Sequence, residues 1–359
     1  MATRPLGRHG GVGVKASSAV VGRRTSRATV TAVVLVATII ALSIVSLHLG
    51  QYRISLPEVA DSLFDRVGLG DGASSMADGV LWDVRLPRIL AGLLVGAGLG
   101  AAGAITQGLF GNPLAEPSVV GITSGAGVGA AAATVLGTAA TMTFVVPVAA
   151  FAAGIATTML VWVLAGSVRG GGTVALVLVG IAVNAVAGAA SSLLIFLADS
   201  TSREAVVFWQ LGSLNGAMWS DVRVAGLLVG AGLVWALFLA PGLDSLALGE
   251  RAAAHTGLDL RRFRIQAVLV AALLTAAAVA VAGIIGFVGL IVPHLLRLVV
   301  GPRQRSILPL SALGGAALIA GSDLVARTTV PFVDLPIGAL TAVVGGPVFF
   351  FLLRTRISA

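Results

Sequence analysis

The sequence predicts an all-α protein that crosses a membrane about ten times. Apolar residues make up 57% of the 359 residues, charged residues only 11%, and the mean hydropathy is +1.02. These values lie well outside the range of soluble domains. Apolar runs recur along the chain, and about 20 residues suffice to cross a hydrocarbon core of roughly 30 Å as a helix. The 47 glycines suit transmembrane helices that approach one another closely.

Ten apolar runs are the candidate spans, in one transmembrane domain over residues 29–355. They are 29–50, 89–109, 118–139, 143–165, 174–198, 223–240, 266–284, 286–300, 308–326 and 336–353. The first run is too long for a typical signal-peptide core, so we interpret it as a span. Residues 1–28 contain basic but no acidic side chains and are predicted to form a cytoplasmic tail.

The apolar stretch 266–300 is too long for one span, because a straight helix of that length would reach about 52 Å. We therefore expect the chain to fold back near Gly283, Gly286 and Gly289, giving two spans that are short or partly re-entrant. In the second run, Gly92, Gly96 and Gly100 are four residues apart and share one helix face, as expected of a packing stripe.

An even number of spans places both termini on the same side of the membrane. Most of the 23 lysine and arginine residues, Arg169 among them, fall on that side, so the positive-inside rule predicts cytoplasmic termini. Acidic residues are concentrated on the other side, in residues 50–87.

A charged island at 241–264, with the sequence PGLDSLALGERAAAHTGLDLRRFR, interrupts the apolar chain. Its helix-forming runs are broken at Gly249 and Gly257. We interpret this cytoplasmic loop as the element through which a soluble partner moves the membrane domain.

Several other functions are disfavoured by the residues. The absence of cysteine excludes disulfides and thiol chemistry, and the only lysine, Lys15, lies in no phosphate-binding loop. A GxGxxG match at Gly98, Gly100 and Gly103 lies inside an apolar run, where helix packing is the favoured role. His294 has no second ligand at metal-binding spacing. We therefore predict no enzyme activity, cofactor or bound metal, and no nucleic-acid partner.

Two polar motifs stand out from the apolar background. Arg85 and Arg88 flank Pro87 on the outer side, as interface anchors or as docking points for carboxylates of an external partner. The second motif, NPLAEPS followed by GITSGAG, combines helix-breaking prolines with small and hydroxyl residues. Its candidates for lining a translocation path are Asn112, Pro113, Ser118, Thr123, Ser124 and Gly125.

These motifs and later blocks together resemble the FecCD-type permease family of ABC importers, which carry iron-siderophores, haem and cobalamin. The blocks RLPR, NPLAEPSVVGITSGAG, LGERAAAHTGLDLRR, GFVGLIVPHLLR, SDLVAR and LPIGALTAVVGGPVFFFLL occur in the family's order. The similarity covers about residues 80–355. It implies the ten-helix type II permease architecture in the bacterial cytoplasmic membrane.

The resemblance also implies partners and contact residues. It implies two cytoplasmic ATPase subunits, an extracytoplasmic substrate-binding protein and a second permease chain, identical or paralogous. Arg85, Arg88 and Arg327 match arginines that meet acidic residues of the binding protein. The matching ATPase-coupling residues are Leu246, Ala247, Leu248, Gly249, Glu250, Arg251, Ala252, Ala253 and Gly257.

The leading hypothesis is thus a permease subunit that imports ferric siderophores with energy from a separate ATPase. Cobalamin and haem remain open as substrates. An ion-coupled secondary transporter is less favoured, because Glu116, Asp323 and Asp334 are expected at span ends or in loops and the spans otherwise lack carboxylates. A non-transporting membrane scaffold is separated from the permease only by the family resemblance.

Overall fold

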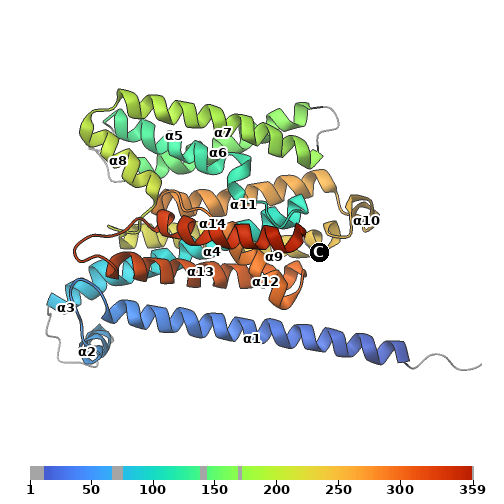
Figure 1. The fold of residues 1–359 in the computed structure, drawn as a ribbon, viewed down its shortest axis with the longest axis horizontal. Coiled ribbons are helices and arrows are strands. Elements are labelled where there is room, and N and C mark those ends of the chain that lie inside the picture. The colour runs from blue at the N-terminus through green and yellow to red at the C-terminus, as the bar shows by residue number, and fades with distance from the viewer. Residues whose placement is uncertain (1–11, 67–75, 138–143, 169–171, 358–359) are drawn as a thin grey trace, which may run out of the picture.

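The computed structural model describes residues 12–66, 76–137, 144–168 and 172–357, and their regular elements are helices (Figure 1). Seven helical stretches are long and apolar enough to cross a membrane: Ser26–His48, Met76–Phe110, Val145–Ser167, Gly172–Leu197, Trp219–Leu246, Leu260–Ala282 and Gln304–Thr328. Three shorter apolar helices, Ile122–Val135, Val288–Val300 and Ile337–Phe351, coincide with the remaining predicted spans. The all-α architecture with about ten spans is confirmed.

The helices follow one another along the chain with short connections. They are α1 (Val12–His48), α2 (Leu56–Arg66), α3 (Met76–Gly79), α4 (Leu86–Phe110), α5 (Ile122–Val135), α6 (Val145–Ser167), α7 (Gly172–Leu197), α8 (Ser200–Leu211), α9 (Trp219–Leu246), α10 (Glu250–His255), α11 (Leu260–Ala282), α12 (Val288–Val300), α13 (Gln304–Thr328) and α14 (Ile337–Ile357). A π-helical turn, Val80–Arg85, joins α3 to α4, and a 3₁₀ turn, Pro117–Val120, precedes α5.

Helix α4 lies at the centre, packed against α9, α11, α12 and α13. Its glycines allow this packing, because a Cβ on Gly96 would lie 2.2 Å from the Gly315 carbonyl oxygen and one on Gly100 would lie 2.0 Å from that of Ser311. Gly103 meets Gly289 of α12 equally closely. The predicted packing stripe is confirmed, and the GxGxxG match serves the same backbone contacts.

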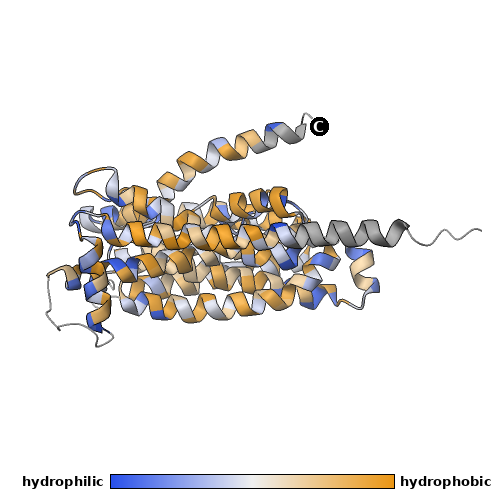
Figure 2. Ribbon diagram, turned by 90° about the horizontal axis from the view of Figure 1, so that it is seen from below, coloured by the Kyte–Doolittle hydropathy of each residue, from blue (hydrophilic) through white to orange (hydrophobic). Residues whose placement is uncertain are grey.

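The bundle has two polar ends. One end, which we call the termini end, contains the start of α1, helix α10 and the end of α14 (Figure 1). The opposite end, which we call the loop end, contains α2, α3 and α8. Hydrophilic residues gather at both ends and hydrophobic ones between them, and α14 leans away from the rest of the bundle (Figure 2).

The break predicted within 266–300 is confirmed. Helix α11 ends at Ala282, and Gly283 adopts φ 68°, where a Cβ would lie 2.2 Å from the Trp209 carbonyl oxygen. The chain resumes a helix only at Val288, after Phe287 at φ 69°. The two spans were expected to be short or partly re-entrant; α12, with 13 residues, is short, whereas α11 has 23 residues.

Some boundaries differ from those expected. The predicted tail 1–28 is helical from Val12, as the start of α1, and residues 1–11 lie outside the described residues, as does Arg169. Both ends of the island 241–264 belong to the adjacent long helices, because α9 continues through Pro241 to Leu246 and α11 begins at Leu260. Apolar composition signals the membrane-crossing part of a helix but not its polar extension beyond the bilayer.

The short helices α2, α3 and α8 at the loop end were not predicted, and for α2 and α8 the reason is their low hydropathy. The α2 N-terminus carries a local signal, since the Glu58 carboxylate accepts hydrogen bonds from the Ser55 backbone N–H and hydroxyl, both at 2.7 Å. These bonds lower the pKa of Glu58. Likewise Asp199 caps α8 by accepting from the Ser202 N–H at 2.9 Å.

Candidate functional site

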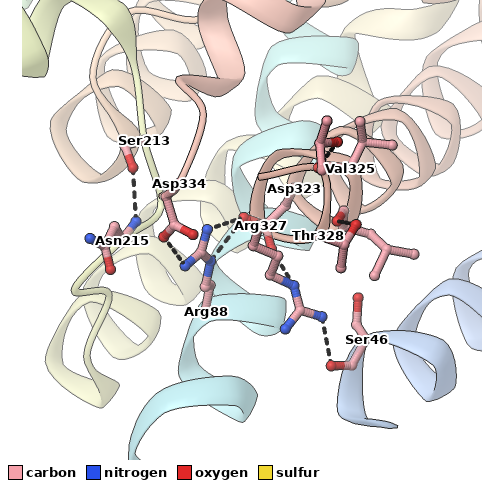
Figure 3. Close-up of polar contacts among 11 residues, drawn as sticks. Ser46, Arg88, Ser213, Asn215, Asp323, Val325, Arg327, Thr328 and Asp334 are labelled. Carbon is pink, nitrogen blue, oxygen red and sulfur yellow. Dashed lines mark hydrogen bonds and ion pairs between the residues drawn. The ribbon is translucent and has the colours of Figure 1, made fainter. Parts of the chain in front are cut away.

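An ion-pair cluster at the loop end joins α4 to α13 and to the segment that follows α13, both of which are distant from α4 in sequence (Figure 3). Arg88, in the first turn of α4, donates from Nε to Asp323 Oδ1 of α13 at 2.9 Å and from Nη1 to Asp334 Oδ2 at 2.7 Å. Asp334 lies in the segment between α13 and α14. Pro87 fits this turn because the first helical positions have no intrahelical N–H bond to lose.

Arg85 and Arg327 attach the same cluster to the end of α1. Arg85 donates to the carbonyl oxygens of Leu47 and Tyr52, and Arg327 Nη2 donates to that of Ser46 at 2.6 Å. The last carbonyls of a helix lack intrahelical partners and carry partial negative charge, so guanidinium groups satisfy them well. Arg327 also lies 3.7 Å from Asp323, one turn away on α13.

The three arginines predicted to dock a binding protein are therefore brought together at one end of the bundle, but as buried groups. Arg85 is 4% exposed, Arg88 8% and Arg327 7%, and each bonds to groups of its own chain. In this conformation their first role is to hold α1, α4, α13 and the 334 segment together. Docking remains a prediction.

The two helix breaks inside the bundle meet at a carboxylate. Glu116 precedes the 3₁₀ turn, and its Oε1 accepts from the Phe287 N–H at 2.8 Å, at the N-cap of α12. A negative charge at a helix N-terminus is favourable, and the bond pairs an N–H that the helix leaves free. The NPLAEPS motif thus stabilises the start of α12, which sequence reasoning did not predict.

Two of the path candidates, Ser118 and Ser124, are joined by Asn184 of α7. Asn184 donates to the Ser118 carbonyl oxygen at 3.2 Å, and the Ser124 hydroxyl lies 2.5 Å from Asn184 Oδ1. Asn184 was not predicted. A single amide inside an apolar span is a usable signal, because burying it is costly unless it is hydrogen-bonded.

The other path candidates are dispersed. Gly125 packs on α6, where a Cβ would lie 2.2 Å from Thr157 Oγ1. Asn112 is exposed and accepts from the Leu114 N–H at 3.0 Å, in a turn that also contains Pro113. Thr123 is half-buried in the first turn of α5.

At the termini end, the island forms a small charged projection. Gly249 at φ 104° and Gly257 at φ 84° delimit α10, as predicted, and the buried Ala253 anchors it. Leu248 is 77% exposed, and Glu250 and Arg251 are also exposed. The remaining coupling candidates, Leu246, Ala247 and Ala252, range from half-buried to exposed.

Polar contacts connect this projection to the spans. Arg264 of α11 pairs with Glu250, and Asp259 accepts from the N–H groups of Arg261 and Arg262 at 3.1 Å, capping α11. Asp244, in the last turn of α9, accepts from the Gln304 N–H at 2.5 Å and so caps α13. This second connection was not predicted, because a cap supplied by another helix leaves no local sequence pattern.

The described residues contain no group of three or more histidine, cysteine, aspartate or glutamate side chains arranged to hold a metal ion. The polar groups described above are instead bonded to helix ends and to one another. A broken-helix bundle with a charged projection at one end and an ion-pair cluster at the other is the architecture of a membrane permease.

Comparison with known proteins shows to which family of permeases this chain belongs. The chain belongs to the FecCD transport family, whose model matches residues 35–355. It is 39% identical to the hemin transport system permease HmuU of Yersinia pestis over 288 residues, 77% of this chain and 84% of that one. It is 38% identical to the vitamin B12 import permease BtuC of Vibrio cholerae over 280 residues (78% and 84%).

A further relative and a solved structure are also transporters of this kind. The Escherichia coli Fe(3+) dicitrate permease FecD is 38% identical over 274 residues, 76% of this chain and 85% of FecD. A solved structure of an inward-facing metal-chelate-type ABC transporter superposes with a TM-score of 0.79 at 32% identity, covering 89% of this chain and 97% of that one. The chain is a permease subunit of a FecCD-type ABC importer.

Proposed function

We propose that this chain imports ferric siderophores across the bacterial cytoplasmic membrane. It would work as a dimer of permease chains, with separate ATPase subunits and an extracytoplasmic binding protein. The relatives named for hemin, vitamin B12 and Fe(3+) dicitrate support a bulky metal chelate as the cargo. A chelate carries its metal within its own ligands, so the permease need not supply any.

The observation that supports an ATPase-driven permease is the charged projection α10 at the termini end. Exposed arginines surround it at that end, at positions 251, 261, 262, 303 and 305. By the positive-inside rule this end is cytoplasmic, with both termini, and the loop end faces outward. An ATPase on the cytoplasmic side would therefore meet α10.

The coupling residues Leu246 to Gly257 are the proposed contact with that ATPase. Exposed Leu248 supplies an apolar anchor, and the Glu250–Arg264 pair links α10 to α11. When ATP closes the ATPase dimer, α10 is displaced and carries the ends of α9 and α11 with it. The two permease chains then rock between outward-open and inward-open states.

For the cargo, we propose a path beside α7 that the second chain completes. Ala185, Gly188 and Ala189 are exposed on α7, where small residues leave room for a bulky chelate. The candidates Asn112, Pro113, Ser118, Thr123, Ser124 and Gly125 would then act at or behind this path. Asn184 holds Ser118 and Ser124 in place.

We propose that the binding protein docks at the loop end. Arg88 and Arg327 pair there with Asp323 and Asp334, whereas the bonds of Arg85 go to carbonyl oxygens. The positive charge of Arg85 is therefore not balanced by an aspartate of this cluster and would attract carboxylates. Because the arginines are buried, direct pairing requires the binding protein to displace a bond within this chain. We expect docking to depend on salt mainly through its association rate.

Haem and cobalamin are the second candidates, favoured by the near-equal identities to HmuU and BtuC. An ion-coupled secondary transporter is not favoured by any of these relatives. Uptake measurements separate the candidates. Cells lacking this chain and complemented cells are supplied with radiolabelled ferric siderophore, hemin or cobalamin, with and without vanadate.

We expect complementation to restore vanadate-sensitive uptake of the ferric siderophore. Restored uptake of hemin or cobalamin instead would identify that ligand as the cargo. Uptake that responds to a protonophore but not to vanadate would overturn ATP coupling.

The coupling role has its own test. The double charge reversal Glu250→Arg and Arg251→Glu should abolish ATPase association and uptake while leaving membrane insertion normal. Asp61→Arg, an exposed charge reversal on α2 at the loop end, is the matched control and should retain both. Wild-type uptake by the double variant would remove α10 from the mechanism.

A further inference from the structure

A pocket of about 550 Å³ opens at the loop end between α8, the end of α11 and the segment before α14. This volume lies in the range of pockets that hold small molecules, about 300–1,000 Å³. Its walls combine the aromatic rings of Phe208, Trp209 and Phe332 with the polar side chains of Ser213, Asn215 and Asp334. Of these side chains, only that of Asp334 takes part in the contacts described for the candidate functional site.

The backbone around the pocket is fixed by hydrogen bonds. The Ser213 N–H donates to the Ala282 carbonyl oxygen at 2.8 Å, and the Ile337 N–H donates to that of Gly212 at 2.9 Å. The Ser213 hydroxyl accepts from the Asn215 N–H at 3.0 Å, beside Asp334 (Figure 3). The pocket is therefore formed before any ligand arrives.

Phe332 is held at the rim in an unfavourable conformation. Its φ is 60°, its N–H donates to Gln51 Oε1 at 2.9 Å, and 87% of the residue is exposed. A non-glycine residue in the left-handed region costs free energy and is commonly found at functional sites. An exposed phenyl ring in this position adds an apolar edge that a ligand can cover.

The charge of the lining is one-sided. Among the described residues that line the pocket, Asp334 is the only ionisable one. The guanidinium of Arg88, which pairs with Asp334 Oδ2, belongs to a side chain that is 10% exposed, against 21% for Asp334. A ligand in the pocket thus meets a carboxylate, an amide, a hydroxyl and aromatic faces, which suit neutral or cationic groups and repel anions.

We propose that this pocket is a receiving site for the chelate, and that it favours neutral and cationic ferric chelates over polyanionic ones. The site rests on the proposed function and narrows its substrate class to chelates such as ferric trihydroxamates. Ferric tricatecholates, which are trianions, and hemin, with two carboxylates, are disfavoured.

Direct binding tests the site without ATP or binding protein. The permease, purified with its ATPase in lipid nanodiscs, is titrated with ⁵⁵Fe-labelled complexes: a neutral trihydroxamate, a trihydroxamate with a free ammonium group, and a tricatecholate. We expect both trihydroxamates to bind more tightly than the tricatecholate, by about tenfold or more. Equal binding of the three, or no binding, would overturn the site.

Exposed Asn215 allows the charge of the wall to be changed without disturbing the Arg88 pair. Asn215→Lys should weaken binding of the ammonium complex by about three- to tenfold and strengthen that of the tricatecholate, and Asn215→Asp should do the reverse. Thr328→Lys and Thr328→Asp, exposed on α13 and outside the lining, should leave the order unchanged. If the Asn215 and Thr328 variants behave alike, the pocket is not the site.

Vanadate-sensitive uptake by the wild type, measured in parallel, keeps the two proposals apart. Uptake of the tricatecholate as fast as the trihydroxamates, with no effect of Asn215 variants, would overturn the pocket and leave the proposed function standing. Absence of vanadate-sensitive uptake for every ferric chelate would overturn the proposed function. The binding order would still decide the pocket.

Discussion

At the scale of residues, the buried charges of this permease are paired at helix ends. Arg88 connects Asp323 and Asp334, while Arg85 and Arg327 satisfy carbonyls at the end of α1. A buried pair is costly to desolvate, and removing one partner leaves an unpaired charge. These residues should therefore affect stability before they affect transport.

Arg88→Ala should lower the free energy of unfolding by about 3–5 kcal/mol, because it leaves Asp323 buried without its main partner. The apolar double variant Arg88→Met with Asp323→Leu should lose less. Thermal unfolding of the purified protein measures both changes, together with single variants for a double-mutant cycle. Arg53→Ala, at an exposed arginine of the same end, is the control and should be close to wild type.

A finding that Arg88→Ala unfolds like wild type, yet loses binding-protein capture, would show instead that docking is the main role of Arg88. The single variant separates the two roles, because a docking contact contributes nothing to the stability of the isolated permease.

Glu116 gives a second prediction at this scale. Glu116→Ala should destabilise the start of α12, because the partly buried Phe287 N–H then loses its acceptor, a loss of about 1–3 kcal/mol. Glu116→Gln keeps an acceptor oxygen and should lie between alanine and wild type. Hydrogen exchange at residues 287–291 reports the change locally. Equal protection in all three proteins would contradict the capping role.

At the scale of helices, backbone contacts determine which helices can be neighbours. Gly96 and Gly100 bring α4 against α13, and Gly103 brings it against α12. Without a hydrophobic driving force between helices in lipid, such contacts depend on close van der Waals packing.

Gly100→Val should prevent correct folding, because its Cβ would overlap the Ser311 carbonyl oxygen at 2.0 Å. We expect a loss of more than about 4 kcal/mol, seen as loss of monodisperse protein after solubilisation. Gly230→Ala is the matched control, since a Cβ there meets nothing within 4 Å. Normal assembly of Gly100→Val would show that α4 and α13 can separate without loss of the fold.

The spans and the stripe of glycines were predictable because hydropathy and helical periodicity are local properties. The fold-back at Gly283 was predictable from span length and glycine placement. The Arg88–Asp323–Asp334 cluster was not, because Arg88 is separated from both aspartates by more than 200 residues and the sequence does not show which charges meet. Glu116 lies between α4 and α5, at a span end as expected, but its capping of α12 could not be predicted from the sequence.

At the scale of the whole molecule, the chain carries its exposed basic residues mainly at the termini end and its small helices α2, α3 and α8 at the other. This asymmetry predicts the orientation of the protein in the membrane.

The protein has no cysteine, so single cysteines can report the orientation directly. In intact spheroplasts, a membrane-impermeant maleimide should label Thr201→Cys at the start of α8. It should label Arg303→Cys, just before α13 and outside the proposed ATPase contact, only after permeabilisation. Both positions are exposed, so access to the reagent depends on the side of the membrane alone. The opposite labelling pattern would invert the topology.

Helix α13 has a mechanical consequence. It is capped by Asp244 of α9 at one end and attached to Arg88 and α1 through Asp323 and Arg327 at the other. Its 25 residues span about 37 Å, and beyond Pro309 no proline interrupts it. Such a helix is expected to move along its axis as a rigid body. We therefore expect a displacement of α9 at the termini end to be transmitted along α13 to the ion pairs at the loop end, so that the two ends of the permease move together.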